Sequence, residues 1–190
     1  MGFSRAELQS YADVEVPDLL PPPDRELRLL FVGINPGLWT AAVQTHFAHP
    51  GNRFYPALLR AGILTEPVDP STGMTDADRA RFVARGLGIT NLAPRATAKA
   101  SELTREELLA GGQRLRALVR ARRPRVVAVA GVTAYRQAFD RRRAVQGPQE
   151  EPLEGAELWV VPNPSGLNAH ETTATLATAY AGPARAAGLL

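Results

Sequence analysis

The sequence LRLLFVGINPG, residues 27–37, is an apolar run that ends abruptly in glycine, asparagine and proline. Such near-continuous runs are typical of a central strand in a parallel sheet, because helices cover both of its faces. The turn places one polar side chain, Asn35, directly after the strand. Open α/β proteins bind ligands at the carboxyl ends of their strands. The stretch therefore predicts an α/β fold with Asn35 at the ligand-binding edge of the sheet.

The rest of the chain alternates between strand and helix patterns. Further strands are predicted at GITNL (88–92), VVAVAG (126–131) and LWVVP (158–162). Helices are predicted at 53–62, at 75–86, from Thr104 onward, at 132–139 and at 172–187, and a long loop at 38–52. This alternation predicts a three-layer α/β/α sandwich with a central, mainly parallel sheet.

Two local signals bear on the helix that begins near Thr104. Thr104 and Glu107 have the spacing of a capping box, which marks a helix start. Gly111 and Gly112 are poor helix formers, so we expect them to weaken the first turns. Residues 1–26 are expected to be an N-terminal extension, stiffened by Pro21–Pro23. Residues 27–190 are then expected to form a single domain and a monomer.

The composition excludes several classes of protein. The 190 residues include no cysteine and three histidines, so disulfides, thiolate catalysis and cysteine-based metal sites are excluded. We expect no metal and no cofactor. The chain has no apolar run long enough to cross a membrane and no secretory signal pattern, so a cytoplasmic location is expected.

The charge favours an anionic partner. The net charge is +3, and Lys99 is the one lysine among 22 basic residues. Arginine forks bind phosphate well, so this composition suits nucleic acid, although an arginine-rich codon bias would give the same balance. Arg53 and Arg95 are the predicted phosphate contacts. The run Arg141–Arg143 is interpreted as a solvated linker.

A second turn resembles the first. NPSGLN (163–168) follows the last predicted strand as GINPG follows the first, and Asn91 ends the strand at 88–92. If these strands are central, Asn35, Asn91 and Asn163 lie on one edge of the sheet. Each Asn-Pro pair taken alone is also explained by an ordinary turn, in which the asparagine bonds to nearby backbone.

GINPGLWT, FAHPGNRF and NPSGLN, in this order, resemble the mismatch-specific uracil/thymine DNA glycosylases, family two of the uracil-DNA glycosylase superfamily. The resemblance extends from about Leu27 to Tyr180 and includes GITNLAPRAT. It implies a monofunctional enzyme that flips uracil, thymine or a modified cytosine out of mismatched double-stranded DNA and hydrolyses its N-glycosidic bond. The product would be an abasic site for base excision repair.

The resemblance also implies roles for individual residues. Asn35 matches the catalytic position, where its amide would hold a water, since an amide is no base at neutral pH. Leu167 matches the residue that wedges into the duplex. The implied base pocket consists of Gly33, Ile34, Thr40, Phe47, Asn91 and Asn163. The implied contacts around the wedge and the orphaned base are Ser165, Gly166 and Asn168.

The sequence departs from the family pattern in three places. Asn91 stands where some members carry lysine, Trp39 and Thr40 stand where small residues are common, and Ala169 stands where arginine is often found. We expect these to change the base preference. Two other functions remain open on the sequence: a DNA protein that binds lesions without cleavage, and an α/β hydrolase acting on free nucleosides.

Overall fold

The computed structural model describes residues 2–190, which fold around a five-stranded sheet in the order β2-β1-β3-β5-β4. The strands are β1 (Leu29–Gly33), β2 (Leu87–Asn91), β3 (Val126–Ala130), β4 (Gly147–Pro148) and β5 (Glu157–Val161). Strands β1, β2, β3 and β5 are parallel, and β4 pairs antiparallel with β5. The predicted α/β sandwich with a mainly parallel sheet is confirmed.

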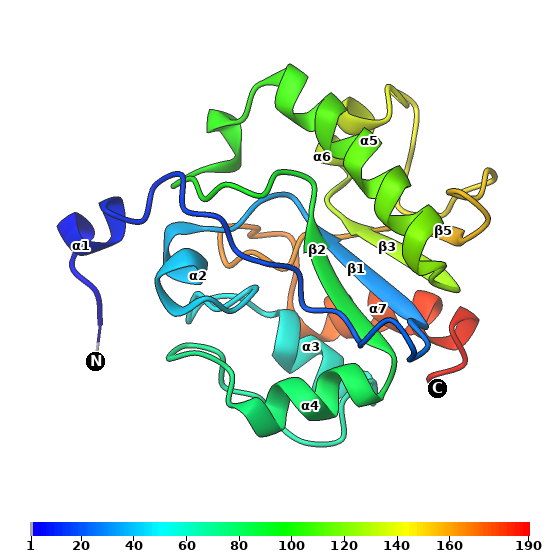
Figure 1. Ribbon diagram of the computed structural model, residues 1–190, viewed down its shortest axis with the longest axis horizontal. Coiled ribbons are helices and arrows are strands. Elements are labelled where there is room, and N and C mark those ends of the chain that lie inside the picture. The colour runs from blue at the N-terminus through cyan, green and yellow to red at the C-terminus, as the bar shows by residue number, and fades with distance from the viewer. Residues whose placement is uncertain (1) are drawn as a thin grey trace.

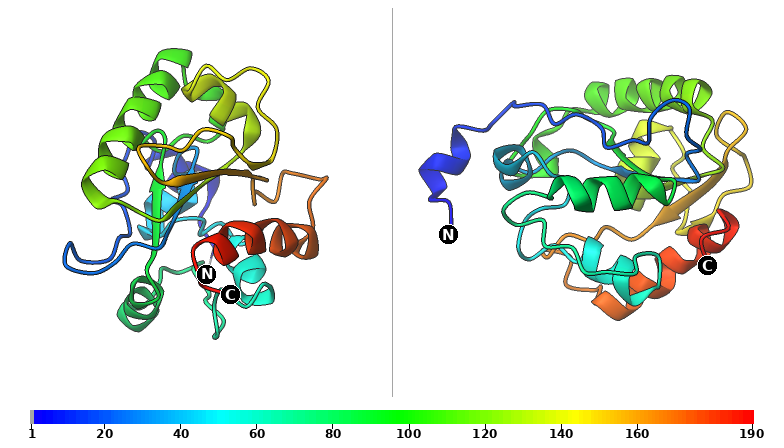
Figure 2. Two further views of the ribbon diagram at one scale, coloured as in Figure 1. Left: turned by 90° about the vertical axis from the view of Figure 1, so that its right-hand side faces the viewer. Right: turned by 60° about the horizontal axis from the view of Figure 1, so that its bottom comes forward.

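Helices cover both faces of the sheet (Figures 1 and 2). One face carries α3 (Phe54–Arg60), α4 (Asp76–Ala84) and α7 (Thr173–Ala186). The other carries α5 (Arg105–Arg122) and α6 (Val132–Ala138). Loops after the parallel strands all leave at one edge, which is where the polar motifs lie.

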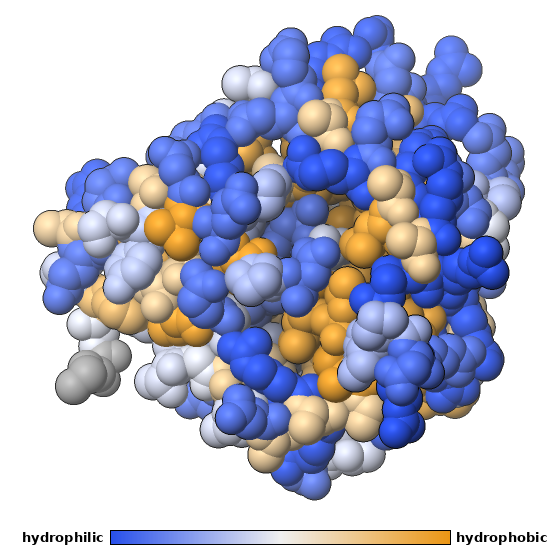
Figure 3. Space-filling model, viewed as in Figure 1, coloured by the Kyte–Doolittle hydropathy of each residue, from blue (hydrophilic) through white to orange (hydrophobic). Residues whose placement is uncertain are grey.

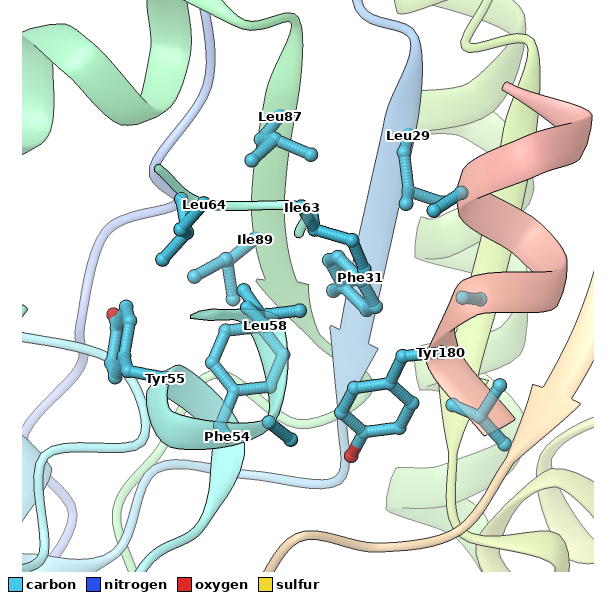
Figure 4. Packing of buried hydrophobic residues seen from close by; sticks show 14 of the residues in the cluster. Leu29, Phe31, Phe54, Tyr55, Leu58, Ile63, Leu64, Leu87, Ile89 and Tyr180 are labelled. Atoms are coloured by element: carbon cyan, nitrogen blue, oxygen red, sulfur yellow. The ribbon is translucent and has the colours of Figure 1, made fainter. Parts of the chain in front are cut away.

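The apolar run of β1 is explained by burial on both faces. Leu29 and Phe31 belong to the core under α3 and α7, whereas Leu30 and Val32 belong to the core under α5 and α6. Figure 4 shows Phe31 beside Phe54 and Tyr180, with ring centroids 5.0 Å and 5.7 Å away. A strand with both faces buried needs apolar residues at every position.

The helix starts follow the predicted capping residues. The hydroxyls of Thr75 and Thr104 each accept a backbone N–H in a capping box, at the starts of α4 and α5. Helix α5 is continuous through Gly111 and Gly112, which were expected to weaken its first turns. A Cβ at either position would lie 2.3 Å from a backbone oxygen, of Leu92 and Ala138 respectively. The two glycines therefore allow α5 to approach its neighbours closely.

Two short elements fall where no regular structure was predicted. Helix α2 (Leu38–Val43) lies inside the predicted loop 38–52, and β4 lies in the segment after Arg141–Arg143. Six-residue and two-residue elements are too short to leave a periodic pattern. A single 3-10 turn, η1 (Ala100–Glu102), precedes α5.

The N-terminal residues lie along the edge of the sheet. Helix α1 (Arg5–Gln9) projects from the body, and the following chain runs beside β2 (Figure 1). Leu19 pairs with Ile89 of β2 through two backbone hydrogen bonds. Val16 is buried, 5% exposed. Residues 13–20 thus cover an edge strand that would otherwise expose unpaired backbone groups.

The face shown in Figure 3 is mainly hydrophilic, with apolar side chains visible between the charged ones. Across residues 2–190, none of the helices combines the length and the apolar character that crossing a bilayer requires.

Candidate active site

The loops after β1, β3 and β5 meet at one edge of the sheet. Gly131 follows β3 with φ of +118°, a conformation that suits glycine. A Cβ there would lie 3.3 Å from Ile34 Cδ1 and 3.9 Å from Asn163 Cβ. The side chains after β1 and β5 therefore approach each other over the end of β3, as the two matching turns predicted.

The amide of Asn35 is held through its nitrogen. Nδ2 donates to the carbonyl oxygen of Pro36 at 2.8 Å and to Oγ1 of Thr97 at 2.7 Å. The Thr97 hydroxyl donates in turn to the carbonyl oxygen of Lys99 at 2.8 Å. The carbonyl oxygen of Pro36 can only accept a hydrogen bond, and the Thr97 hydroxyl already donates its proton to Lys99. The Asn35 atom that faces both groups must therefore be the nitrogen Nδ2, which donates. The carbonyl oxygen Oδ1 is left on the opposite side of the amide.

Thr97 was not predicted as a site residue. It is 3% exposed and lies in the loop after β2, whose backbone also pairs with the GINPG turn: Thr97 N–H donates to Pro36 O at 3.1 Å. The only signal in the sequence was its place in GITNLAPRAT. A threonine in a loop has many uses, so its contact with Asn35 had to come from the structure.

Asn91 and Phe47 crowd the space beside Gly33, the last residue of β1. A Cβ on Gly33 would lie 2.3 Å from Asn91 Oδ1 and 3.3 Å from Phe47 Cζ. The absence of a side chain thus lets both residues lie close to one point beside the GINPG turn. Gly33, Asn91 and Phe47, which were predicted for the base pocket, are brought together here.

Phe47 has an unusual backbone. Its φ is +56°, which is rare for a bulky residue and indicates strain held by the surrounding structure. Its ring stacks on Phe54, with centroids 4.1 Å apart and planes 27° apart. Phe47 is partly exposed, whereas Phe54 is 1% exposed. A buried ring therefore supports the partly exposed ring of Phe47 beside Gly33.

His46, next to Phe47, is buried and bridges two segments. Nε2 lies 3.0 Å from the carbonyl oxygen of Pro17, and Nδ1 lies 3.1 Å from Nδ2 of Asn91. Burial lowers the pKa of His46 to about 4, so its ring is neutral at physiological pH. No role for this histidine followed from the sequence.

Other residues of the 38–54 segment hold the loop in place. His49 Nδ1 accepts the N–H of Gly51 at 3.0 Å, and Asn52 Oδ1 accepts that of Phe54 at 2.9 Å. Thr40, predicted for the base pocket, is 5% exposed, and its hydroxyl lies 3.4 Å from the backbone nitrogen of Ala48. The structure places Thr40 beneath the loop that carries Phe47.

Trp39 points toward the N-terminal residues. Its indole N–H donates to the carbonyl oxygen of Ser71 at 2.9 Å, and its ring packs edge to face with Phe3 at 4.9 Å. The His49 ring lies at 5.8 Å. Trp39 therefore joins three segments near the catalytic turn.

The turn after β5 presents one leucine to solvent. Asn163 Oδ1 accepts the N–H of Ser165 at 3.0 Å, and Ser165 Oγ accepts the N–H of Leu167 at 3.3 Å. Asn168 Nδ2 donates to the carbonyl oxygen of Asn163 at 3.1 Å. Leu167 itself is 90% exposed. Polar side chains thus brace a tight loop whose tip is a large apolar residue.

This loop is docked on the segment after Phe47. Arg53 donates from Nη1 to the carbonyl oxygens of Ser165 and Asn168, at 3.3 Å and 3.2 Å. A Cβ on Gly166 would lie 2.5 Å from the carbonyl oxygen of Gly51. Arg53, predicted to contact phosphate, instead positions the leucine loop.

Arg95, the other predicted phosphate contact, also forms contacts within the protein. Its guanidinium pairs with Glu107 at 2.5 Å and with Asp13 at 2.9 Å. It ties the N-terminal segment and the β2 loop to α5, so its charge is already neutralised. Within residues 2–190, no group of three or more histidine, aspartate or glutamate side chains could hold a metal ion.

Comparisons with known proteins agree with this architecture. A family profile described as "Uracil DNA glycosylase superfamily" matches residues 22–181. The chain is also similar to a solution NMR structure from Methanosarcina acetivorans, provisionally described as a uracil DNA glycosylase. The two share 18% sequence identity and a TM-score of 0.57, over 93% of this chain and 98% of the other. At this identity, the structural likeness is evidence for the fold.

Proposed function

This chain belongs to the uracil DNA glycosylase superfamily, and on that premise we propose that it is a monofunctional DNA glycosylase acting on mismatched duplex DNA. It flips a uracil, or a related base, out of the helix and hydrolyses the N-glycosidic bond, leaving an abasic site. The motifs GINPG and NPSGLN support the mismatch-specific uracil/thymine branch of the superfamily.

The observation that carries this proposal is the fixed orientation of the Asn35 amide. Pro36 O and Thr97 Oγ1 bind its nitrogen, which leaves Oδ1 to accept a hydrogen bond from a water. An amide cannot abstract a proton at neutral pH, so positioning is its contribution. A water held by Oδ1 would attack the anomeric carbon as the base leaves and the sugar becomes oxocarbenium-like.

The base pocket of this proposal lies beside Phe47 and Asn91. A flipped base would stack on the exposed part of Phe47, and stacking on an aromatic side chain is worth about 1–3 kcal/mol. Flipping costs a few kcal/mol and least for a mispaired base, which favours mismatched substrates. The exposure of Leu167 supports a role as the wedge that fills the gap in the duplex, as apolar side chains do in DNA-bending proteins.

The monofunctional assignment depends on Lys99, the one lysine of the chain. A glycosylase that also cleaves the strand needs an amine to form a Schiff base with the sugar. The carbonyl of Lys99 accepts from Thr97, so its backbone lies near Asn35. We propose that its amine takes no covalent part. Borohydride treatment during the reaction should trap no DNA–protein adduct, whereas a trapped adduct lost in Lys99→Arg would make the enzyme bifunctional.

The function is tested by single-turnover cleavage of labelled duplexes carrying G·U, A·U or G·T. We expect abasic sites to form fastest with G·U, and the G·T lane to report how far thymine enters the proposed base pocket. Alkali treatment reveals the abasic sites, and chromatography identifies the released base. Binding to these duplexes without release of any base would replace the proposal with lesion recognition alone.

A further inference from the structure

We propose that residues 13–16 of the N-terminal segment form a brace that positions the side-chain amide of Asn35. The brace holds the loop after β2 against the GINPG turn, and this loop supplies the Thr97 hydroxyl to Asn35. The inference rests on the proposed function where it concerns the rate of base release, whereas the orientation of the amide can be measured without activity.

The brace and the GINPG turn lie on opposite sides of the loop after β2. On one side, Asp13 N–H donates to Ala96 O at 2.9 Å, and Ala96 N–H donates to Val14 O at 3.0 Å. On the other side, Thr97 N–H donates to Pro36 O at 3.1 Å. The loop is thus the middle one of three chain segments, and the brace binds the residue directly before Thr97.

The brace fastens a stretch of the loop that the turn itself does not hold. Ala93 N–H donates to Ile34 O at 2.8 Å, and within residues 2–190 the next backbone hydrogen bond from this loop to the turn is that of Thr97. The stretch between these two points is bound to the brace at Ala96. The brace therefore helps to fix Thr97 Oγ1 at its distance of 2.7 Å from Asn35 Nδ2.

A small apolar cluster joins the brace to the helix that follows the turn. Val16 of the brace packs with Ala96 of the loop and Ala41 of α2, and all three are buried. Gln44, the C-terminal cap of α2, donates from Nε2 to Glu15 O at 3.4 Å. Helix α2 begins directly after GINPG. The brace thus contacts both the loop beside the turn and the helix that continues it.

Asp13 determines the shape of the brace. Its φ is +64°, in the left-handed region where aspartate and asparagine are more common than other side chains. Its carboxylate pairs with Arg95 at 2.9 Å but is 74% exposed, and exposed ion pairs contribute little. The turn and the backbone N–H of Asp13, rather than its charge, are therefore what the brace requires.

The substitution Asp13→Pro tests the brace in the full-length protein. Proline fixes φ at about −65° and has no N–H, so both the turn and the hydrogen bond to Ala96 O are lost. We expect single-turnover release of uracil from a G·U duplex to slow by about tenfold at unchanged duplex affinity, because Asn35 loses its orientation.

Two variants are the controls. Asp13→Asn keeps the N–H and tolerates the left-handed conformation, so it should stay within about threefold of the wild-type rate. Gln9→Pro places a proline in α1, which buries no residue and lies outside the brace, and it should react as fast as wild type. Asp13→Asn as slow as Asp13→Pro would contradict a role of the backbone turn.

A double-mutant cycle separates positioning from a general loss of stability. In a Thr97→Val background Asn35 has already lost its acceptor, so Asp13→Pro should cause no further slowing. Val16→Ala changes no backbone group and carries the same test if Asp13→Pro does not fold. It should slow release in the native background and have no effect beside Thr97→Val. A wild-type rate for Asp13→Pro, or equal slowing in both backgrounds, would overturn the brace.

If wild-type protein releases no uracil, the proposed function fails, and the brace is tested by NMR instead. The side-chain NH₂ of Asn35, labelled with ¹⁵N, donates to Pro36 O and Thr97 Oγ1, so its exchange with solvent measures how firmly the amide is held. We expect exchange in Asp13→Pro to be faster than in wild type and in Asp13→Asn. Unchanged exchange in Asp13→Pro would overturn the proposal.

Discussion

The neighbours of Asn35 orient its side-chain amide, because they accept hydrogen bonds from the amide nitrogen Nδ2. A free asparagine could turn either end of its amide toward a water, and only one end accepts a hydrogen bond. Pro36 O and Thr97 Oγ1 remove this ambiguity. The orientation of the amide at the tip of GINPG thus depends on a buried hydroxyl that lies 62 residues further along the chain.

The substitution Thr97→Val tests that dependence, because it removes the hydroxyl oxygen that accepts the hydrogen bond of Asn35 Nδ2. Valine keeps the shape but removes the acceptor for Asn35, so the amide is less firmly oriented. We expect single-turnover release of uracil to slow by about tenfold, with unchanged affinity for the duplex. Thr97→Ser retains the hydroxyl and is the control. Equal rates for the valine variant and wild type would show that Thr97 does not orient Asn35.

Because His46 is buried in its neutral form, we expect the free energy of unfolding to depend on pH. Its pKa is about 4 in the folded protein, against 6.5 for an ordinary histidine. Between these values the unfolded chain binds a proton that the folded chain excludes. The free energy of unfolding therefore falls as the pH drops from 6.5 toward 4, by about 1.4 kcal/mol per pH unit.

Urea unfolding at pH 7 and pH 5 measures this effect. Wild type should lose about 2 kcal/mol more than His46→Asn over this interval, because titrations common to both proteins cancel in the comparison. The same loss in both proteins would mean that His46 is not buried in its neutral form.

At the scale of elements, the site is built where loops leave parallel strands. The sequence was sufficient to predict the four parallel strands, their common edge and the asparagines at that edge, because buried strands and Asn-Pro turns leave strong local patterns. It was not sufficient for Thr97, His46 or Arg53. Their roles come from contacts between loops distant in the sequence, and such contacts leave no periodic signal.

The exposed Leu167 at the tip of the loop after β5 leads to a separate prediction. Leu167→Ala removes the exposed apolar tip without touching the hydrogen bonds of Asn163, Ser165 and Asn168. We expect uracil release from G·U duplex to fall by about tenfold or more, because unstacking then lacks its wedge. Release from single-stranded DNA should change little.

Leu109→Ala, at an exposed position on α5, is the matched control for loss of a surface leucine. An equal loss of activity on single-stranded and duplex DNA would contradict the wedge. It would place Leu167 in the chemistry or in the stability of the loop instead.

At the scale of the whole molecule, the N-terminal residues belong to the architecture of the site. Residues 13–20 cover the edge strand β2, and Pro17 reaches His46. The sequence predicted only an extension, since a segment with few buried residues and a polyproline stretch shows no strand pattern. Arg95 adds an ion pair to Asp13 that fastens this segment from the other side.

Two truncations test this view. Removal of residues 2–20 should lower the free energy of unfolding by at least about 2 kcal/mol, since it exposes the Val16 site and unpairs β2. Removal of residues 2–11 takes away α1, which buries no residue, and should cost much less. Comparable urea midpoints for both truncations would show that residues 13–20 add no stability.

The most direct test of the central claim compares wild type with Asn35→Ala on a G·U duplex under single-turnover conditions. Released uracil is measured by chromatography, and duplex affinity is measured in parallel. We predict uracil release by wild type and a loss of about 100-fold in the variant at similar affinity, because a mispositioned water costs that much. Uracil release by Asn35→Ala at the wild-type rate would contradict the assignment of Asn35 as the residue that holds the attacking water.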